Sequence, residues 1–367
     1  MQYKKIEELT TVVTGGTPST GKIEYWENGD IPWLQSGCCQ NSDVNSTDKY
    51  ITKEGYDNSS TRMMPPNTVM IALTGATAGK VGYLKFEACG NQSITGILPC
   101  DSLNPRYLFY YLLSQRDKIL NDCVGGAQAH VSQGYVKNMR VPVLSIIEQK
   151  QIVEVLTKLF SIITMRQREK RMLEDLIKAR FVEMFGDPDL NEKEWDINKM
   201  ERLCEVSSSK RIYQNEQSVI GIPFLRISDL VNRMDTGSKE CDLYIPEEKY
   251  EELKDQGLVP IKGDILLTAR GTLGRCYIIQ ENDEFYFQDG MITWLSNFNE
   301  KITSLYIAYL FSMPGFRKQI DALQAGSTVA YLSISMTKKL DIMVPPIELQ
   351  NQFADFVHQV DKSKLLR

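Results

Sequence analysis

Apolar and polar residues alternate with a helical period over one long stretch in the middle of the chain. The stretch starts at Ser145-Ile-Ile-Glu148, a capping box in which the serine side chain binds a free backbone amide and the glutamate binds the amide of the cap residue. The pattern runs to Phe185, and Gly186 and Pro188 predict its end. We therefore expect a helix of about 40 residues, a rod of roughly 60 Å.

The apolar residues of this helix follow alternating steps of four and three, the spacing of a coiled-coil seam. They are Ile152, Leu156, Leu159, Ile163, Leu173, Ile177 and Met184, and Arg166, Lys170 and Arg180 interrupt the seam. A single amphipathic helix of this length is not stable in water, so its apolar stripe needs a partner surface. A second helix, of about 20 residues, is predicted after Pro345-Pro346, where Leu349, Phe353, Phe356 and Val360 repeat the spacing.

The chain on either side of the central helix carries one sequence pattern twice. Ile31-Pro32-Trp33-Leu34 returns as Ile222-Pro223-Phe224-Leu225, and Gly75–Lys80 returns as Arg270–Arg275. Five more matches keep the same order: Ile6–Leu9 with Met200–Leu203, Tyr50-Ile51 with Tyr244-Ile245, Tyr107–Leu112 with Leu305–Leu310, Gly126–Gln128 with Gly326–Thr328, and Glu148–Ile152 with Leu349–Phe353. Solenoid repeats are far shorter, so the pattern predicts a duplicated domain.

Each copy mixes strand-like runs with helical ones, which predicts an α+β (mixed α/β) fold. Strands are expected at Val69–Leu73, Gly82–Phe86, Asp264–Leu267, Tyr277–Gln280 and Ile292–Leu295, and helices at Arg106–Asn121 and Ser304–Leu323, the latter broken at Pro314-Gly315. The predicted boundaries are residues 1–145 for the first domain, 146–186 for the central helix, 187–346 for the second domain and 347–367 for the C-terminal helix.

The composition is that of a globular protein and does not indicate a particular function. With 42% hydrophobic and 24% charged residues the chain is typical of a globular protein, and its apolar runs are too short for a membrane helix. The first residues lack the apolar core of a signal peptide, so the expected location is the cytoplasm and the eight cysteines are expected to be reduced. The two histidines, His130 and His358, do not predict a metal site.

The loop Gly75-x-x-x-Gly79-Lys80-Val81 has three interpretations. A nucleotide-binding P-loop needs four residues between the glycines and Ser or Thr after the lysine, and this loop has neither. A plain turn between strands accounts for the glycines. A turn that presents Lys80, Arg270 and Arg275 to a polyanion fits both copies of the loop.

Charge does not by itself indicate a nucleic-acid partner. Net charge is −5, and residues 187–345 carry 25 acidic and 18 basic side chains. A protein that binds DNA alone is usually basic. Either the basic residues gather on one face, or partner proteins supply much of the phosphate contact.

The chain resembles, over nearly its whole length, the specificity subunit (HsdS) of type I restriction–modification systems. The resemblance lies in Gly15–Pro18, Ile31–Leu34, Gly263–Leu266, the Arg270–Arg275 loop, Val344–Pro346 and, above all, Glu148–Ile152. It implies two target-recognition domains that each read half of a bipartite DNA site, with the central helix setting the gap and the second helix antiparallel to it. It also implies a non-catalytic subunit that directs methylation and cleavage by its partners.

The partners implied are double-stranded DNA, two modification subunits and restriction subunits. S-adenosylmethionine, ATP and Mg²⁺ are expected on those subunits and no cofactor on this chain. The C-terminal helix ends at Arg367. If it packs antiparallel to the central helix, it would cover residues 166–186 of that helix and leave Ile152, Leu156, Leu159 and Ile163 exposed. That stripe is then expected to meet a modification subunit or a second copy of this chain.

The residues predicted to contact DNA are polar side chains in loops beside strands, where they can reach a groove. They are Lys80, Arg270 and Arg275, followed by Thr17, Lys49, Arg62, Lys210, Arg211 and Arg226. Three alternatives stay open: a nucleotide-binding enzyme that uses the Gly79-Lys80 loop, a scaffold without a nucleic-acid ligand, and a silent or recombining specificity cassette.

Overall fold

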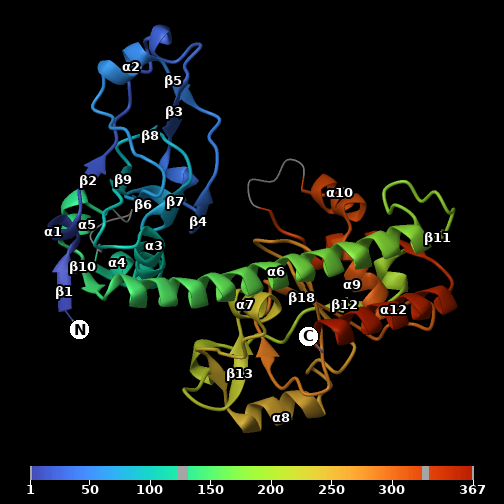
Figure 1. Cartoon of the computed structure of the whole chain (residues 1–367). Helices are drawn as coiled ribbons and strands as arrows, with labels where there is room; N and C mark the ends of the chain where they lie inside the picture. The colour runs from blue at the N-terminus through green and yellow to red at the C-terminus, as the bar shows by residue number, and fades with distance from the viewer. Residues whose placement is uncertain (1, 123–130, 325–329, 366–367) are drawn as a thin grey trace. The chain divides into compact units, whose positions relative to one another are not determined.

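The computed structural model describes residues 2–122, 131–324 and 330–365, and the chain divides into two compact units, Met1–Arg166 and Gln167–Arg367 (Figure 1). The predicted repeat at Gly126–Gln128 and Gly326–Thr328, and His130, lie outside the described residues. Within the described ranges, no helix is long and apolar enough to cross a membrane.

The predicted central helix is confirmed as α6 (Ile146–Phe185), a helix of 40 residues. Its capping box is present: the Ser145 amide donates to the Glu148 carboxylate at 2.9 Å, and the Glu148 amide donates to Ser145 Oγ at 3.3 Å. The helix stops at Gly186, whose φ of +82° suits a residue without a Cβ. Its first part belongs to the first unit and its last part to the second.

In the first unit, the described residues form a five-stranded sheet of order β2-β9-β6-β7-β4, a three-stranded sheet of order β5-β3-β8, and a ribbon of β1 with β10. Two pairings are parallel, β4 with β7 and β3 with β8. The strands are β1 (Gln2–Lys5), β2 (Val12–Thr14), β3 (Ile31–Leu34), β4 (Ser42–Val44), β5 (Tyr50–Ile51), β6 (Val69–Ala72), β7 (Val81–Leu84), β8 (Cys89–Gly90), β9 (Ile94–Ile97) and β10 (Arg140–Val143).

Short helices complete this unit, and α3 packs on β6 and β7. They are α1 (Ile6–Leu9), α2 (Lys53–Asp57), α3 (Pro105–Ser114), α4 (Arg116–Asp122) and α5 (Gln133–Asn138), with 3-10 turns at Ile23–Tyr25, Ser36–Cys38 and Gly75–Thr77. The single helix predicted over Arg106–Asn121 is wrong. Gln115, at φ −94° and ψ 0°, leaves the helical region and separates α3 from α4.

In the second unit, the described strands form a sheet of order β12-β18-β15-β16, a sheet of order β14-β13-β17 and a ribbon of β11 with β19. The strands are β11 (Asp196–Lys199), β12 (Glu205–Ser207), β13 (Ile222–Leu225), β14 (Tyr244–Ile245), β15 (Ile265–Thr268), β16 (Cys276–Ile278), β17 (Tyr286–Phe287), β18 (Ile292–Ser296) and β19 (Asp341–Val344). The helices are α7 (Ile227–Thr236), α8 (Glu247–Asp255), α9 (Ser304–Ser312), α10 (Pro314–Ala322), α11 (Ile334–Lys338) and α12 (Ile347–Leu365), with 3-10 turns at Met200–Arg202 and Gln214–Glu216.

The duplication is confirmed strand by strand. The order β2-β9-β6-β7 matches β12-β18-β15-β16, and β5-β3-β8 matches β14-β13-β17. The parallel pair Leu34 with Gly90 has its counterpart in Leu225 with Phe287. The copies differ most in the segment after β3 or β13: strand β4 extends the first sheet, and helix α7 follows β13 in the second domain.

One buried glutamine closes each copy. Gln149 accepts a hydrogen bond from the Asn104 amide at 2.7 Å and donates to the Ser102 and Leu144 carbonyls. Gln350 accepts from the Thr303 amide at 2.9 Å and donates to the Lys301 and Pro345 carbonyls. Both side chains are fully buried, and each satisfies three backbone groups of its domain. Gln149 belongs to the Glu148–Ile152 motif, and Gln350 holds the matching position in the second copy.

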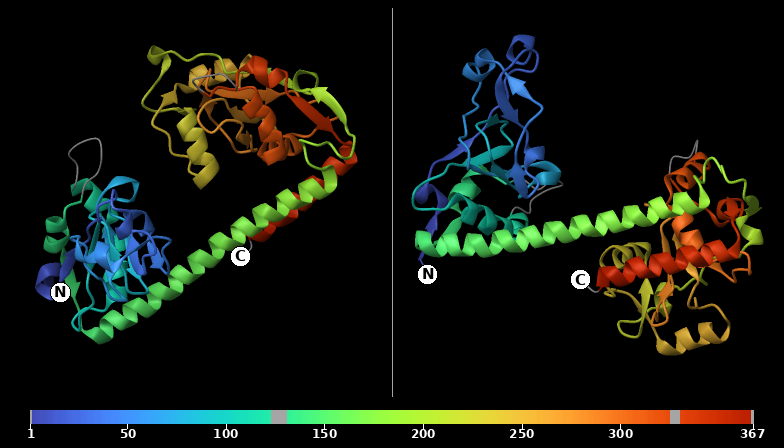
Figure 2. Two further views of the ribbon diagram at one scale, coloured as in Figure 1. Left: turned by 90° about the horizontal axis from the view of Figure 1, so that it is seen from above. Right: turned by 45° about the vertical axis from the view of Figure 1, so that its right-hand side comes forward.

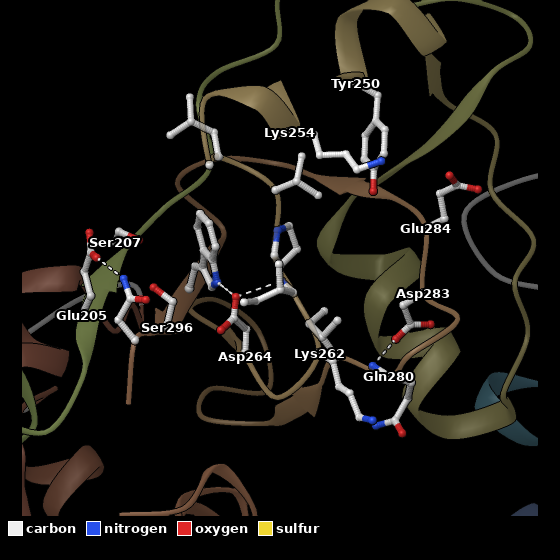
Figure 3. A pocket seen from close by; sticks show the side chains of 18 of the residues that line it. Glu205, Ser207, Tyr250, Lys254, Lys262, Asp264, Gln280, Asp283, Glu284 and Ser296 are labelled. Carbon is white, nitrogen blue, oxygen red and sulfur yellow. Dashed lines mark hydrogen bonds between the residues drawn. The ribbon is translucent and has the colours of Figure 1, made fainter. Parts of the chain in front are cut away.

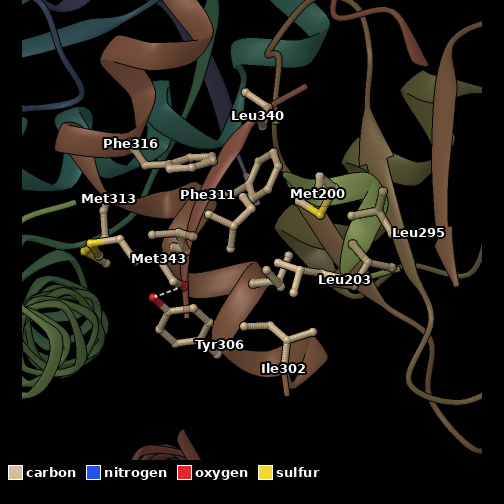
Figure 4. Packing of buried hydrophobic residues seen from close by; sticks show 14 of the residues in the cluster. Met200, Leu203, Leu295, Ile302, Tyr306, Phe311, Met313, Phe316, Leu340 and Met343 are labelled. Atoms are coloured by element: carbon tan, nitrogen blue, oxygen red, sulfur yellow. Dashed lines mark hydrogen bonds between the residues drawn. The ribbon is translucent and has the colours of Figure 1, made fainter. Parts of the chain in front are cut away.

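Aromatic side chains hold α12 against the last turns of α6, side by side in both views of Figure 2. The Phe353 ring lies 5.5 Å from Phe181 and 5.4 Å from Phe185, whereas Arg180 lies over Phe356 at 5.8 Å. Later residues of α12 thus meet earlier residues of α6, and the predicted antiparallel packing is confirmed. This contact joins a core that includes Tyr306, Met343 and Phe316 (Figure 4).

The stripe at the start of α6 is only partly bare, which corrects the prediction. Ile152 and Leu156 pack on the core of the first unit, because α6 closes that domain as α12 closes the second. Leu159 and Ile163 remain 49% and 50% exposed. Further along, Leu173 and Ile177 pack in the second unit's core, which also contains Phe353 and Val360, with Phe356 at its edge.

Candidate nucleic-acid interface

One end of the five-stranded sheet gathers polar loops in the first unit. The pairings of Thr14 with Thr95, and of Ala72 with Ile94, show that β2 and β6 end where β9 begins. The predicted residues Lys80 and Thr17 both lie in loops at this end. Loops at one sheet end can present several side chains to one ligand surface, so we take this end as the candidate interface.

Each of these two residues has a neutral partner. Lys80 Nζ donates to Gln40 Oε1 at 2.9 Å, and Gln40 stands two residues before β4. Thr17 Oγ1 donates to Gln92 Oε1 at 2.5 Å. Gln40, Gln92 and Thr17 are all exposed, so these groups are available to an incoming ligand.

The second unit repeats the arrangement with ionic partners. Arg275 Nη2 lies 2.5 Å from Asp235 Oδ1, and the pKa of Asp235 is lowered by this contact with the guanidinium. Arg211 Nε donates to Asp289 Oδ2 at 2.8 Å. Arg270, in the same loop as Arg275, lies over the Tyr331 ring at 5.0 Å and is exposed.

The two glycine loops share one backbone hydrogen bond and the conformation of their second glycine. The Gly79 amide donates to the Ala72 carbonyl, and the Gly274 amide donates to the Thr268 carbonyl, each at 2.9 Å. Both glycines have positive φ, +73° and +75°, which a side chain would disfavour. Each loop leads into a strand, β7 or β16, rather than the helix that follows a P-loop.

The other predicted residues are more scattered. Arg62 and Lys210 are exposed, and Arg62 donates to the carbonyl of its neighbour Thr61. Lys49 lies beside the three-stranded sheet, where its carbonyl accepts from the Trp33 amide. Arg226 caps α7 and is held by two carboxylates, Asp229 and Asp242, each at 3.0 Å; these hydrogen bonds raise the pKa of Arg226.

Sequence patterns missed the partners Gln40, Gln92, Asp235 and Asp289, because each lies 40 or more residues from the residue it holds. They also missed Arg116 on α4 and Arg317 on α10, which lie beside Gly79 and Gly274. Arg317 donates to the Leu273 carbonyl. The available signal was the repeat itself, which aligns these two arginines at the start of the second helix of each pair.

The opposite end of the second sheet carries a pocket of about 890 Å³, drawn in Figure 3. Its lining has more carboxylates than lysines: Glu205, Asp264, Glu281, Asp283 and Glu284 against Lys254 and Lys262. Asp264 accepts from Trp294 Nε1 at 2.8 Å, and burial raises its pKa. Carboxylates repel phosphate, so this pocket does not suit a DNA backbone. In the described part of the chain, no cluster of three or more His, Cys, Asp or Glu side chains could hold a metal ion.

Comparisons with known proteins agree with the duplicated fold. The sequence model of the type I restriction modification DNA specificity domain matches residues 1–175 and 192–366. The type I restriction enzyme MjaIX specificity subunit of Methanocaldococcus jannaschii is 26% identical over 379 residues, covering 96% of this chain and 85% of that protein. The putative specificity subunit S.HindORF215P of Haemophilus influenzae is 25% identical, covering 98% and 88%.

Two further comparisons are narrower in what they show. The EcoR124I/EcoR124II specificity subunit of Escherichia coli is 32% identical over 163 residues, 43% of this chain and 40% of that protein. The crystal structure of the type I restriction–modification S subunit from M. genitalium superposes with a TM-score of 0.56 at 15% identity, covering 99% of this chain and 90% of that one. At that identity the superposition establishes the shared fold.

Two copies of one mixed domain, each closed by a helix and each matched by the DNA specificity domain, define a two-domain DNA specificity protein. The chain belongs to the type I restriction–modification specificity family, and DNA target recognition is its function. Its relatives are specificity subunits, a class that is generally non-catalytic. None of these comparisons supports a nucleotide-binding enzyme, a scaffold or a silent cassette.

Proposed function

We propose that each domain reads one half of a bipartite DNA target through the loops at one end of its larger sheet. The observation that carries this is the repetition of paired polar groups at the same sheet end in both copies, Lys80 with Gln40 and Arg275 with Asp235. Side chains held in this way are suited to base edges, which are read by directed hydrogen bonds. Helix α6, which belongs to both units, would set the unread gap.

The subunit would act within a cytoplasmic complex whose partners carry out methylation and cleavage. Its charge supports this division of labour, because the second domain has 25 acidic against 18 basic residues and phosphate contacts supply much of the affinity for DNA. Two modification subunits and restriction subunits would add those contacts. S-adenosylmethionine, ATP and Mg²⁺ would be bound by them.

The surface that we assign to a modification subunit lies on α6. Val155, Leu159, Ile162 and Ile163 are each 49–58% exposed. A contiguous apolar helix face of this kind marks a protein interface. A second copy of this chain is the competing occupant.

A groove beside this face supports a helical partner. Tyr107, Tyr110, Ile152, Leu156 and Phe160 line an open, mostly apolar pocket of about 430 Å³ between α3 and α6. In the second unit the matching helices are α9 and α12, and Phe181 and Phe185 pack there on Tyr306 at 5.5 Å and 4.9 Å. The second domain thus shows what fills such a groove, a helix with large apolar residues one turn apart.

The experiment that tests the proposal is methylation mapping of host DNA with and without this gene, its modification-subunit genes being present throughout. The expected result is methylation at one motif with two specified halves and an unspecified gap, seen only when this gene is present. Identical methylation in both strains, or a motif with a single continuous half, would contradict the proposal.

A further inference from the structure

The partner of the loop cation comes, in each domain, from an element that the other domain lacks. Lys80 and Arg275 occupy equivalent positions, since their carbonyls accept from the amides of Ala72 and Thr268, each at 2.9 Å. The side chain that holds Lys80 is Gln40, two residues before β4, whereas Asp235 near the end of α7 holds Arg275. The shared scaffold therefore supplies the cation, and the copy-specific element supplies its partner.

In a second pair, the partner comes from an equivalent position in both domains. The amides of Asn91 and Gln288 both donate to the last residue of the parallel strand, Leu34 or Leu225, at 2.9 Å. The next residue in each copy is the partner: Gln92 accepts from Thr17, and Asp289 accepts from Arg211. Both pairs of the first domain are thus held by amides, and both pairs of the second by carboxylates.

This difference has a chemical consequence for base recognition. An arginine reads guanine with two parallel hydrogen bonds to O6 and N7, and a carboxylate that fixes the guanidinium leaves the remaining N–H groups to make them. Asp289 takes Nε of Arg211, and among the described residues nothing takes its terminal nitrogens. Asp235 takes one N–H of Nη2 of Arg275, so the second N–H of that nitrogen remains to act in parallel with Nε or Nη1.

The two arginines flank strands of one sheet, β12-β18-β15-β16. Arg211 lies four residues after the end of β12, and Arg275 lies directly before β16. Loops beside the strands of one sheet can present side chains to one ligand surface.

We propose that Asp235 and Gln40 are specificity-determining residues: Asp235 orients Arg275, alongside Arg211 and Asp289, toward guanines in the half-site of the second domain, and Gln40 orients Lys80 in the other half-site. This rests on the proposed function and deepens it. Because β4 and α7 are not shared, exchanging either partner changes one half-site and leaves the other intact.

The test is methylation mapping in cells that hold the full chain with its modification subunits, for wild type, Asp235→Asn, Asp235→Glu, Gln40→Ala and Glu281→Gln. Glu281 is the matched control, because it pairs with Lys262 at 2.5 Å at the opposite end of the second domain's sheet. Asp235→Asn is expected to lose about tenfold discrimination at one guanine of one half-site. Asp235→Glu should restore part of it, Gln40→Ala should relax only the other half, and Glu281→Gln should match wild type.

Other results would contradict the inference or the proposed function. A wild-type bipartite motif that Asp235→Asn leaves unchanged would overturn this inference and leave the proposed function standing. Equal relaxation in Glu281→Gln, or relaxation of both halves by Asp235→Asn with an unchanged unfolding midpoint, would also overturn it. Absence of bipartite methylation in wild type would remove the proposed function, and this inference with it.

Discussion

At the residue scale, the buried glutamines show how a single side chain can anchor a domain. Gln350 is fully buried and satisfies three backbone groups, from Lys301, Thr303 and Pro345. Leaving a buried backbone group without a partner costs about 1–3 kcal/mol. The position therefore tolerates little besides glutamine.

We predict that Gln350→Leu lowers the free energy of unfolding of the second domain by about 3 kcal/mol, because three backbone groups lose their partner. Urea denaturation followed by tryptophan fluorescence measures this change. The matched control is Gln359→Leu, at an exposed position of the same helix. Equal effects of the two substitutions would contradict the role assigned to Gln350.

Thiol reactivity gives a second prediction at this scale. A hydrogen bond from Cys39 lowers the pKa of Cys38, whereas burial raises the pKa of Cys204 to about 12. A lower thiol pKa means more thiolate at a given pH, and thiolate is the reactive form. Iodoacetamide at pH 8, followed by peptide mass spectrometry, should modify Cys38 well before Cys204. Equal rates in the native protein would count against it.

At the element scale, the contact of α12 with α6 is the packing that closes the second domain. Phe353 is fully buried and its ring meets those of Phe181, Phe185 and Tyr309 at 5.3–5.5 Å. Removing a buried phenylalanine side chain costs about 3–5 kcal/mol. The stability of this domain therefore depends on a helix that follows its last strand.

We predict that Phe353→Ala destabilises the second domain by about 3–5 kcal/mol and leaves the first domain unchanged. Hydrogen exchange measured by mass spectrometry separates the two, since peptides of the second domain should lose protection selectively. Ile163→Ala, at a 50% exposed position of α6, should change stability by no more than about 0.5 kcal/mol. Loss of protection in both domains with Phe353→Ala would contradict the prediction.

The elements also show what sequence patterns can and cannot predict. Period and capping predicted the two ends of α6, because both depend on residues close in the chain. The repeat predicted the duplication. The apolar spacing in α6 predicts that Ile152 and Leu156 contact another chain, whereas both pack on the core of the first unit. Periodicity shows that a helix face is apolar but does not show what covers it. The partners Gln40 and Asp235 depend on contacts between distant segments, which local patterns do not contain.

At the scale of the whole molecule, the exposed apolar face of α6 is the surface expected to bind a partner subunit. We predict that the double substitution Leu159→Glu and Ile163→Glu prevents association with the modification subunit, because two charges would be buried without partners. The fold should be unaffected, since both positions are about half exposed. Size-exclusion chromatography with light scattering measures the mass of the complex.

The matched control for this prediction is Lys158→Glu, which places the same charge on the exposed polar face, where Lys158 pairs with Glu154. That variant should assemble as wild type does. Normal assembly of the double variant would move the docking surface elsewhere, and a monomeric, soluble protein without partners would argue against self-association through this face.

Each domain begins and ends in the same place. Gln2–Lys5 runs beside Arg140–Val143, and Asp196–Lys199 runs beside Asp341–Val344, so the first and last strands of a domain form one ribbon. The rest of each domain lies in the sequence between these two paired strands, so the backbone enters and leaves the domain at neighbouring points. Such a domain can therefore be exchanged as a unit, because the two points at which its chain must be joined lie side by side. If each domain reads its own half of the target, as proposed, exchange of one domain between related proteins would change one half-site and leave α6 and α12 unchanged.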